Sequence, residues 1–270
     1  AAIDVAFKYV DKIAPLLGHP RMIITPDLSA QTGEAEENFS ISAAQNIVGF
    51  FEQGLLTSAI NVPNIQPSQM NLVGPYLDLA RRLGQFLGGL ASESISKFVV
   101  QVRGEISGVD MDPISNAGLW GLLNVVEGSH VNYVNAPVAA KQRGIRVLQT
   151  TQKDEQQFGA SIKMTLVSVS GQEISVEGAL IHRVGNEPRI IGVGSFITEA
   201  VPSGPMLLVR NRDIPGMIAG VAGALAKSGA NIAQMNLSRD KPGGTAISIL
   251  NLDSPANDQT LEAIRSMEGI

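Results

Sequence analysis

Hydrophobic residues recur along the chain with two periods, which predicts a mixture of helices and strands. Apolar side chains at three- and four-residue steps indicate helices over residues 33–54, 70–90 and 112–126. Alternation of apolar and polar side chains indicates strands over residues 21–25, 97–107, 145–151, 161–169, 172–182 and 189–198. The mixture predicts an α/β (α+β) chain whose middle part, residues 63–203, forms an open sheet with helices on one face.

The last part, residues 204–270, follows the order strand, helix, strand, strand, helix, and its polar residues cluster where the first strand leads into the first helix. Pro215 suits the first helical turn because it has no N–H to leave unpaired, and Asp213 just before it can cap the free amides. Gly216 allows the backbone to approach a ligand. The start of such a helix offers N–H donors and a positive dipole to a carboxylate.

A free amino acid fits this corner. We expect its α-carboxylate to meet the backbone from Ile214 to Met217, and Asp213 to bind its α-ammonium group. Asn231 precedes the second strand and offers amide contacts to a polar side chain. The same Asp-x-Pro-Gly pattern is also a common way to start a helix, with no ligand involved.

Residues 206–270 resemble the ACT domain, a βαββαβ ferredoxin-like regulatory module. Asn211, Asp213 and Asn231 fall on the positions where amino-acid-binding ACT domains contact their effector. The resemblance implies a homo-oligomer in which ACT domains pair side by side, with effector sites at the seam. The sequence ends at Ile270, where the last strand of the module is expected to begin.

Residues 1–62 resemble the final piece of the substrate-binding domain of D-2-hydroxyacid dehydrogenases, most closely those acting on D-3-phosphoglycerate. The similarity lies in the sequence IITPDLSAQTGEAEEN and in residues 58–63. The catalytic histidine of that family falls on Asp27, and the Glu-Pro dipeptide that supplies its partner carboxylate is replaced around residues 7–11. An ionised aspartate would repel an anionic substrate. We therefore expect no catalytic residue in this chain.

The resemblance implies NAD as the cofactor of a longer parent enzyme, but none for this chain. Gly192-x-Gly194 and Gly220-x-x-Gly223 lack the full glycine spacing of a dinucleotide loop between strand and helix. The sequence has no initiator methionine and opens as though within a domain, so we expect a fragment or a processed product.

Residues 63–203 resemble the intervening, or allosteric substrate-binding, domain of the longer phosphoglycerate dehydrogenases, on the sequence Val134-Asn135-Ala136 and residues 141–144. Its basic side chains could bind a phosphorylated anion; they are Lys141, Arg143, Arg146, His182, Arg183 and Arg189. Some bacterial members hold an anion between this domain and the ACT domain. When this sequence is aligned without gaps to those members, only one basic residue of their anion site is kept, as Arg189. The other basic positions of that site fall on Ile197, Val201 and Asn251. The alternative is scattered, solvated surface charge.

Composition narrows the possible partners. A net charge of -5 offers no electrostatic footprint for nucleic acid or an acidic membrane, and no apolar run is long enough to span a bilayer. The absence of cysteine excludes disulfides and thiolate sites and fits a reducing compartment, such as the cytoplasm or the plastid stroma. The three histidines are far apart in sequence, so we expect no metal site.

Two functions follow from these patterns. The first is the regulatory C-terminal half of a phosphoglycerate dehydrogenase-like oxidoreductase of L-serine biosynthesis, whose ACT domain binds L-serine or another small amino acid. The alternative is a stand-alone, non-catalytic amino-acid-sensing or assembly module that has lost its dehydrogenase core. A third option, the regulatory part of a serine dehydratase, is disfavoured by the dehydrogenase-like residues 1–62.

Overall fold

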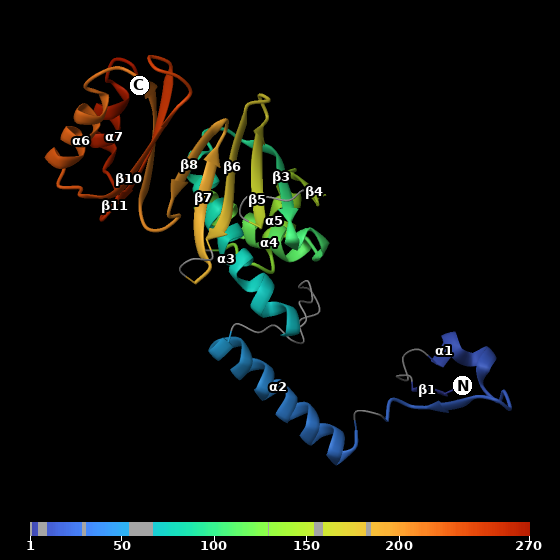
Figure 1. The fold of residues 1–270 in the computed structure, drawn as a ribbon. Helices are drawn as coiled ribbons and strands as arrows, with labels where there is room; N and C mark the ends of the chain where they lie inside the picture. Colours follow the sequence, from blue (N-terminus) through green and yellow to red (C-terminus); the bar gives the residue numbers. More distant parts are fainter. Residues whose placement is uncertain are drawn as a thin grey trace. The chain divides into compact units, whose positions relative to one another are not determined.

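The computed structural model describes residues 2–4, 10–28, 31–53, 67–128, 130–153, 159–181 and 185–270 (Figure 1). The chain divides into two compact units, Ala1–Pro67 and Ser68–Ile270. None of the helices in the described ranges is long and apolar enough to cross a membrane.

The first unit holds a two-stranded parallel sheet and one long helix. Strand β1 (Ala2–Asp4) pairs with β2 (Ile23–Thr25), and between them lie α1 (Val10–Ile13) and the 3-10 helix η2 (Ala14–Leu16). Oδ1 of Asp4 accepts hydrogen bonds from Oγ1 of Thr25 at 2.7 Å and from the N–H of Leu28 at 2.9 Å, which fixes the turn after β2. Helix α2 spans Gly33–Gln53, close to the predicted range.

The second unit begins with a six-stranded sheet in the order β4-β3-β5-β6-β7-β8. The strands are β3 (Ile95–Gly104), β4 (Arg146–Gln152), β5 (Ala160–Ser168), β6 (Glu173–Ile181), β7 (Glu187–Val193) and β8 (Phe196–Ala200). Among the described residues of this six-stranded sheet, β3–β4 is the only parallel pair, because the chain crosses between these two strands through helices. Those helices are α4 (Asp112–Glu127) and α5 (Ala136–Gln142), and α3 (Pro67–Leu90) precedes β3.

Helices α3, α4 and α5 cover one face of this sheet, as predicted (Figure 1). Every second residue of β3 is buried against them, namely Phe98, Val100 and Val102. Helices α3 and α4 approach through glycine: a Cβ built on Gly121 would lie 1.9 Å from the carbonyl oxygen of Arg81. The close crossing of the two helices therefore depends on a missing side chain.

Residues 206–270 form a second, three-stranded antiparallel sheet in the order β10-β11-β9. Its elements are β9 (Met206–Arg212), α6 (Met217–Lys227), β10 (Ile232–Arg239), β11 (Thr245–Leu252) and α7 (Asp258–Arg265). Helices α6 and α7 cover one face, where Val209, Leu225 and Ile264 form a small core. On the opposite face, Ile247 and Ile249 of β11 join the core of the six-stranded sheet.

Three local predictions were wrong. The single strand over 189–198 is a hairpin, β7 and β8, because Gly194 turns the chain with φ 58°. The strand over 97–107 ends at Gly104, whose φ of 81° leads into the 3-10 helix η3 (Glu105–Gly108). Pro215 is not in the first turn of its helix, since α6 begins at Met217. In each case a glycine with positive φ sets the boundary of the element where the hydrophobic pattern does not.

Candidate functional site

The corner between β9 and α6 is a turn over residues 213–216. Gly216 has φ 93°, a left-handed conformation that interrupts the helical path and delays α6 until Met217. The N–H of Ile214 donates to the carbonyl of Arg212 at 2.9 Å, so this amide is already used within the turn. Because Pro215 carries no N–H, the backbone donors left for a ligand are those at the start of α6, from Gly216 and Met217.

The prediction that Asp213 caps α6 was wrong. Among the described residues, α6 has no side-chain cap, and its first N–H groups lack the intrahelical acceptors that later residues find. Oδ2 of Asp213 instead accepts hydrogen bonds from Nη1 of Arg239 at 2.9 Å and from the N–H of Gly243 at 3.1 Å. The carboxylate is therefore fixed over the loop between β10 and β11.

These two bonds also set the protonation of Asp213. The hydrogen bond from Arg239, then that from Gly243, holds the pKa of the Asp213 carboxyl below its usual value, because both donors favour the charged form. At neutral pH the corner thus places an ionised carboxylate, paired with Arg239, beside the positive start of a helix. That pair of charges is the complement of an amino acid's ammonium and carboxylate groups.

Asn211 lies two residues before Asp213 and is almost fully buried, with an exposed fraction of 6%. Its Nδ2 donates to the carbonyl of Arg212 at 2.6 Å, and its Oδ1 is buried with no hydrogen-bond partner among the described residues. Register places Asn211, Ala246 and Arg239 in one row across the three strands. Asn211 is therefore a buried sheet residue next to the corner, and its side chain binds the backbone of Arg212 just before Asp213.

Asn231 lies at the other end of the same sheet. Strand β10 begins just after Asn231, and its first residue, Ile232, pairs with Leu252 at the end of β11. Asp213 follows the end of β9, which pairs with the start of β11. Nδ2 of Asn231 donates to Oδ2 of Asp253 at 2.8 Å. The length of β11, seven steps of about 3.3 Å, separates Asn231 from Asp213 by roughly 23 Å. One copy of the chain does not bring these two residues together.

Arg189, the predicted anion-binding residue, is paired with acidic side chains. Its Nη2 contacts Oε2 of Glu187 at 2.7 Å, and its Nε lies 3.8 Å from Oε1 of Glu199. Arg143 is likewise paired with Glu127. His182 and Arg183 lie outside the described residues. Arg143 and Arg189 of the basic set therefore belong to separate ion pairs.

Neither glycine pair that resembles a dinucleotide loop occupies such a loop. Gly192 and Gly194 lie at the β7–β8 hairpin, and Gly220 and Gly223 lie inside α6. A phosphate loop requires glycines between a strand and the start of a helix.

Asp27, at the position of the family's histidine, is exposed and has φ 58°, and its carbonyl accepts a hydrogen bond from Nε2 of Gln31.

Comparison with protein families assigns two segments of the chain. Residues 72–194 match the family model of the D-3-phosphoglycerate dehydrogenase intervening domain, and residues 205–269 match that of the ACT domain. The chain carries these two domains in series. The phosphoglycerate dehydrogenase resemblance of the sequence is thereby confirmed.

Full-length relatives agree with this assignment. D-3-phosphoglycerate dehydrogenase from Synechocystis is 34% identical over 271 residues, covering 100% of this chain and 48% of the relative. The protein of the same name from Methanocaldococcus jannaschii is 32% identical, covering 100% of this chain and 51% of the relative. An Arabidopsis relative named D-3-phosphoglycerate dehydrogenase 2, chloroplastic, is 29% identical, with 46% of it covered. The chain spans about half the length of the curated relatives it matches.

Sequence reasoning missed three residues that hold the ACT corner and its opposite end: Arg239, Gly243 and Asp253. The strand order could have indicated them. Strands β9 and β10 lie on either side of β11 and run in the same direction, so their C-terminal ends lie at the same end of the sheet. A basic residue at the end of β10 is thus placed to meet an acid at the end of β9. The pairing of Asp253 with Asn231 follows from the same register at the other edge.

Proposed function

We propose that this chain is the regulatory C-terminal half of a phosphoglycerate dehydrogenase of L-serine biosynthesis, and that its ACT domain binds L-serine or a similarly small amino acid. The observation that supports this best is the β9–α6 corner, where an ionised Asp213 stands beside the uncapped start of α6. The match of residues 205–269 to the ACT family places the corner in a domain of the expected kind.

The proposed site is shared by two copies of the chain. Asp213 and the start of α6 come from one copy, and Asn231 comes from the other, because strand register separates these residues within a single copy. A two-fold arrangement that places the β9 end of one sheet beside the β10 start of the next would form two equal sites. This proposal accounts for the homo-oligomer that the resemblance implies.

Each group of an amino acid has a partner in this arrangement. The α-ammonium would bind Oδ1 of Asp213, since Oδ2 is occupied by Arg239 and Gly243. The α-carboxylate would accept from the N–H groups of Gly216 and Met217. A side-chain hydroxyl would meet the amide of Asn231 from the second copy. Ile214, with an exposed fraction of 40%, offers apolar contact to a short side chain.

NAD belongs to the proposed parent enzyme rather than to this chain. The described glycine pairs lie in a hairpin and within a helix, which does not fit a dinucleotide site. Incubation of this chain with phosphoglycerate and NAD should therefore give no NADH, and measurable turnover would contradict our interpretation of Asp27. We place the parent in a reducing compartment, the cytoplasm or the plastid stroma, since the sequence has no cysteine.

The alternative is a non-catalytic amino-acid sensor or assembly module without a dehydrogenase core. Asp27 at the position of the family's histidine favours it. Mass spectrometry of the native protein separates the two functions. A longer chain that carries a Gly-x-Gly-x-x-Gly loop supports the enzyme, and a native chain of this length supports the sensor.

Isothermal titration calorimetry with L-serine tests the proposed effector. Wild-type chain should bind, and Asp213→Asn and Asn231→Ala should each weaken binding by at least about tenfold, the effect of losing one charge-assisted or buried hydrogen bond. Asp258→Asn, in the first turn of α7, is the matched control and should bind as the wild type does. A wild-type trace without heat at millimolar L-serine would exclude serine, and glycine, alanine and threonine would then be titrated.

A further inference from the structure

A pocket opens within the intervening domain, at the end where helices α3 and α4 finish. It has a volume of about 590 Å³, which falls within the range of small-molecule sites, roughly 300 to 1,000 Å³. Its walls come from the loop after α3, the end of α4 and the turn between α5 and β4. The lining includes Glu93, Ile95, Leu123, Val126, Arg143 and Ile145.

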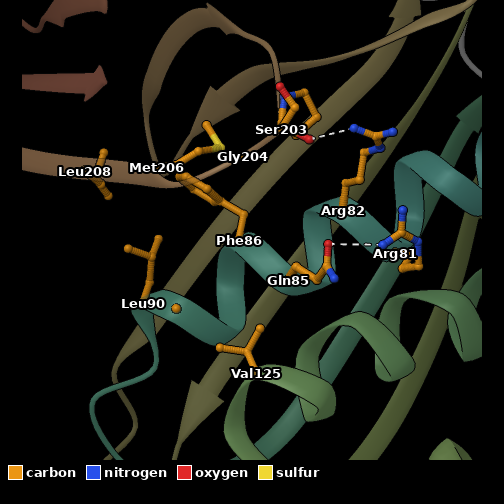
Figure 2. Close-up of a pocket in the computed structure, with 12 residues that line it drawn as sticks. Arg81, Arg82, Gln85, Phe86, Leu90, Val125, Ser203, Gly204, Met206 and Leu208 are labelled. Atoms are coloured by element: carbon orange, nitrogen blue, oxygen red, sulfur yellow. Dashed lines mark hydrogen bonds between the residues drawn. The ribbon is translucent and has the colours of Figure 1, made fainter. Parts of the chain in front are cut away.

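This pocket is separate from the cleft that Figure 2 shows. That cleft lies at Arg82, whose Nη1 donates to the carbonyl of Pro202 at 3.1 Å, between α3 and the segment that leads into β9. Two neighbouring residues of α4 mark the separation, because Val125 lines the cleft and Val126 lines the pocket. All lining residues of the pocket belong to the intervening domain, so an occupant requires nothing from the ACT domain.

The inner wall of the pocket is apolar. Leu123 is fully buried, and Ile145 has an exposed fraction of only 7%. Val126, with an exposed fraction of 45%, lies nearer the mouth. These side chains fit a ligand with a short hydrophobic body.

The charged side chains of the pocket leave one negative charge unbalanced. Nε of Arg143 contacts Oε1 of Glu127, so this guanidinium group already has its counter-charge. Glu93 has no basic partner among the described residues. Its Oε2 accepts a hydrogen bond from Oγ of Ser170 at 2.5 Å, and its Oε1 accepts none from the described part of the chain. The charge in excess is therefore the carboxylate of Glu93.

A chain of hydroxyl groups fixes the position of this carboxylate. Oγ of Ser168 lies 2.7 Å from Oγ of Ser170, which in turn donates to Glu93. The turn that carries both serines is bound to the loop after α3, since the N–H of Val169 donates to the carbonyl of Ser94 at 2.9 Å. Glu93 is thus oriented before any ligand arrives, which lowers the entropy that binding must cost.

The ends of two helices add to the negative field. Neither α3 nor α4 has a basic residue in its last turn. The last carbonyl groups of a helix lack intrahelical donors and carry a partial negative charge. Ala91 directly follows α3, and Leu123 and Val126 lie in the last two turns of α4, so both ends border the pocket. The pocket therefore favours a cation.

We propose that this pocket binds an organic ammonium ion with a short apolar body. The ammonium group has three N–H donors, which bind Oε1 of Glu93 and carbonyl groups at the ends of α3 and α4. The apolar body packs against Leu123 and Ile145. A bare divalent cation fits less well, because it needs several oxygen ligands and the described residues hold no group of three or more acidic or histidine side chains.

Titration of the 270-residue chain with benzylamine, which is protonated at neutral pH, tests this site. NMR signals of the backbone N–H groups of Ser92, Ser94 and Ile145 report occupancy of the pocket itself. Benzyl alcohol offers the same body without the charge, phenylacetate carries the opposite charge, and methylamine tests the head alone. Benzylamine should saturate these signals below roughly 10 mM and bind at least about fivefold more tightly than each of the other three.

Two glutamates provide the variant and its control. Glu93→Gln removes the charge with little change of size and should weaken benzylamine binding by about fivefold or more. Glu173→Gln removes an exposed carboxylate at the start of β6 that does not line the pocket, and should change binding by less than about twofold. Both variants alter the net charge of the chain equally, so a difference between them reports position.

Two neighbouring valines locate the site independently. Val126 and Val125 have similar exposed fractions, 45% and 49%, so lysine at either position is compatible with folding. Val126→Lys places a fixed ammonium group at the pocket and should weaken benzylamine binding by about fivefold or more, whereas Val125→Lys should change it by less than about twofold.

The outcomes are separable. Saturable benzylamine binding that is weakened in Glu93→Gln and Val126→Lys and kept in both controls supports the site. Equal effects of variant and control, benzyl alcohol binding as tightly as benzylamine, shifted signals away from the pocket, or no saturation would each overturn it. Calorimetry with L-serine on Glu93→Gln should match the wild type, so failure here is distinct from failure of the ACT effector site.

Discussion

Nη1 of Arg239 donates a 2.9 Å hydrogen bond to Oδ2 of Asp213, which joins the ends of the two strands that flank β11. The ion pair is partly exposed, with side-chain exposed fractions of 52% for Arg239 and 22% for Asp213. Its main effect is therefore on the position and charge of the carboxylate rather than on the stability of the domain. Asp213 is held with one oxygen occupied and its charge retained.

The first prediction concerns the pKa of Asp213. Arg239→Gln should raise this pKa from its lowered value toward that of an ordinary aspartate, because the largest cause of the shift is the hydrogen bond from Arg239. A depressed pKa stabilises the folded state above the unfolded pKa, about 3.9, and this contribution disappears as pH falls through the folded value. Titration of the Asp213 carboxyl carbon by NMR measures the pKa directly.

Arg265→Gln is the control for this titration. Arg265 is exposed on α7 and pairs with Glu262, so its removal should leave the titration of Asp213 unchanged. An Asp213 midpoint that is the same in wild type and Arg239→Gln would mean that the ion pair does not persist in solution.

The second prediction follows from the opposite placement of Asp213 and Asn231 on the sheet. If each effector site takes one of these residues from each copy, a dimer of one Asp213→Asn chain and one Asn231→Ala chain has one site with both substitutions and one intact site. Co-expressed, doubly tagged heterodimers should then bind L-serine at near wild-type affinity with half the stoichiometry. Calorimetry measures both quantities.

Either homodimer provides the comparison, because both of its sites carry a substitution. Heterodimers that bind no better than the homodimers would show that each site uses residues of a single chain. This result would contradict the shared site without excluding an effector at the Asp213 corner.

Many of the long elements were predictable because hydrophobic periodicity survives in them, whereas the short helix α5 and the β7–β8 hairpin were not predicted. The long helices α3 and α4 carry repeated apolar side chains, and β5 and β6 alternate clearly. Asn257 is a residue type that favours helix starts, and its Oδ1 accepts from the N–H of Thr260 as the N-cap of α7. These signals are local, and so they can be read from one sequence.

The interactions at the site were less predictable because they depend on strand register. Asp213 and Arg239 are 26 residues apart, and nothing in the local sequence of either indicates the other. The pattern Asp-x-Pro-Gly predicted a capped helix, but the left-handed Gly216 moves the helix start beyond the reach of Asp213. The same limit hid the cleft at Arg82, whose walls come from segments 120 residues apart.

The third prediction concerns two glycines in helices. Gly121→Ala should destabilise the chain by about 2 kcal/mol or more, because the new Cβ would lie 1.9 Å from the Arg81 carbonyl oxygen and would force α3 and α4 apart. Gly223→Ala on α6 should stabilise it by about 1 kcal/mol, since no atom lies within 4 Å and alanine has the higher helix propensity. Urea denaturation measures both changes.

Gly223 also tests the surface that pairs two copies. A variant that is more stable yet elutes as a smaller species in size-exclusion chromatography would place this face of α6 at the interface between copies. A stabilised variant with unchanged elution places the interface elsewhere, while destabilisation together with unchanged elution would contradict the propensity argument.

The fourth prediction concerns the connection between the domains. Nδ2 of Asn251 donates to the carbonyls of Val201 and Ser203, both at 2.9 Å, and Asn251 is buried with an exposed fraction of 7%. Asn251→Ala removes both bonds and should cost about 2 kcal/mol, because the segment that leads into β9 then keeps only the bond from the N–H of Leu252 to the carbonyl of Pro205 as a hydrogen bond to β11. Limited proteolysis should then cut residues 201–205 faster than in the wild type. Asn231→Ala, which removes one exposed hydrogen bond, should leave cleavage there unchanged. Equal cleavage rates in all three chains would mean that other contacts, such as that of Arg82 with Pro202, hold the connection alone.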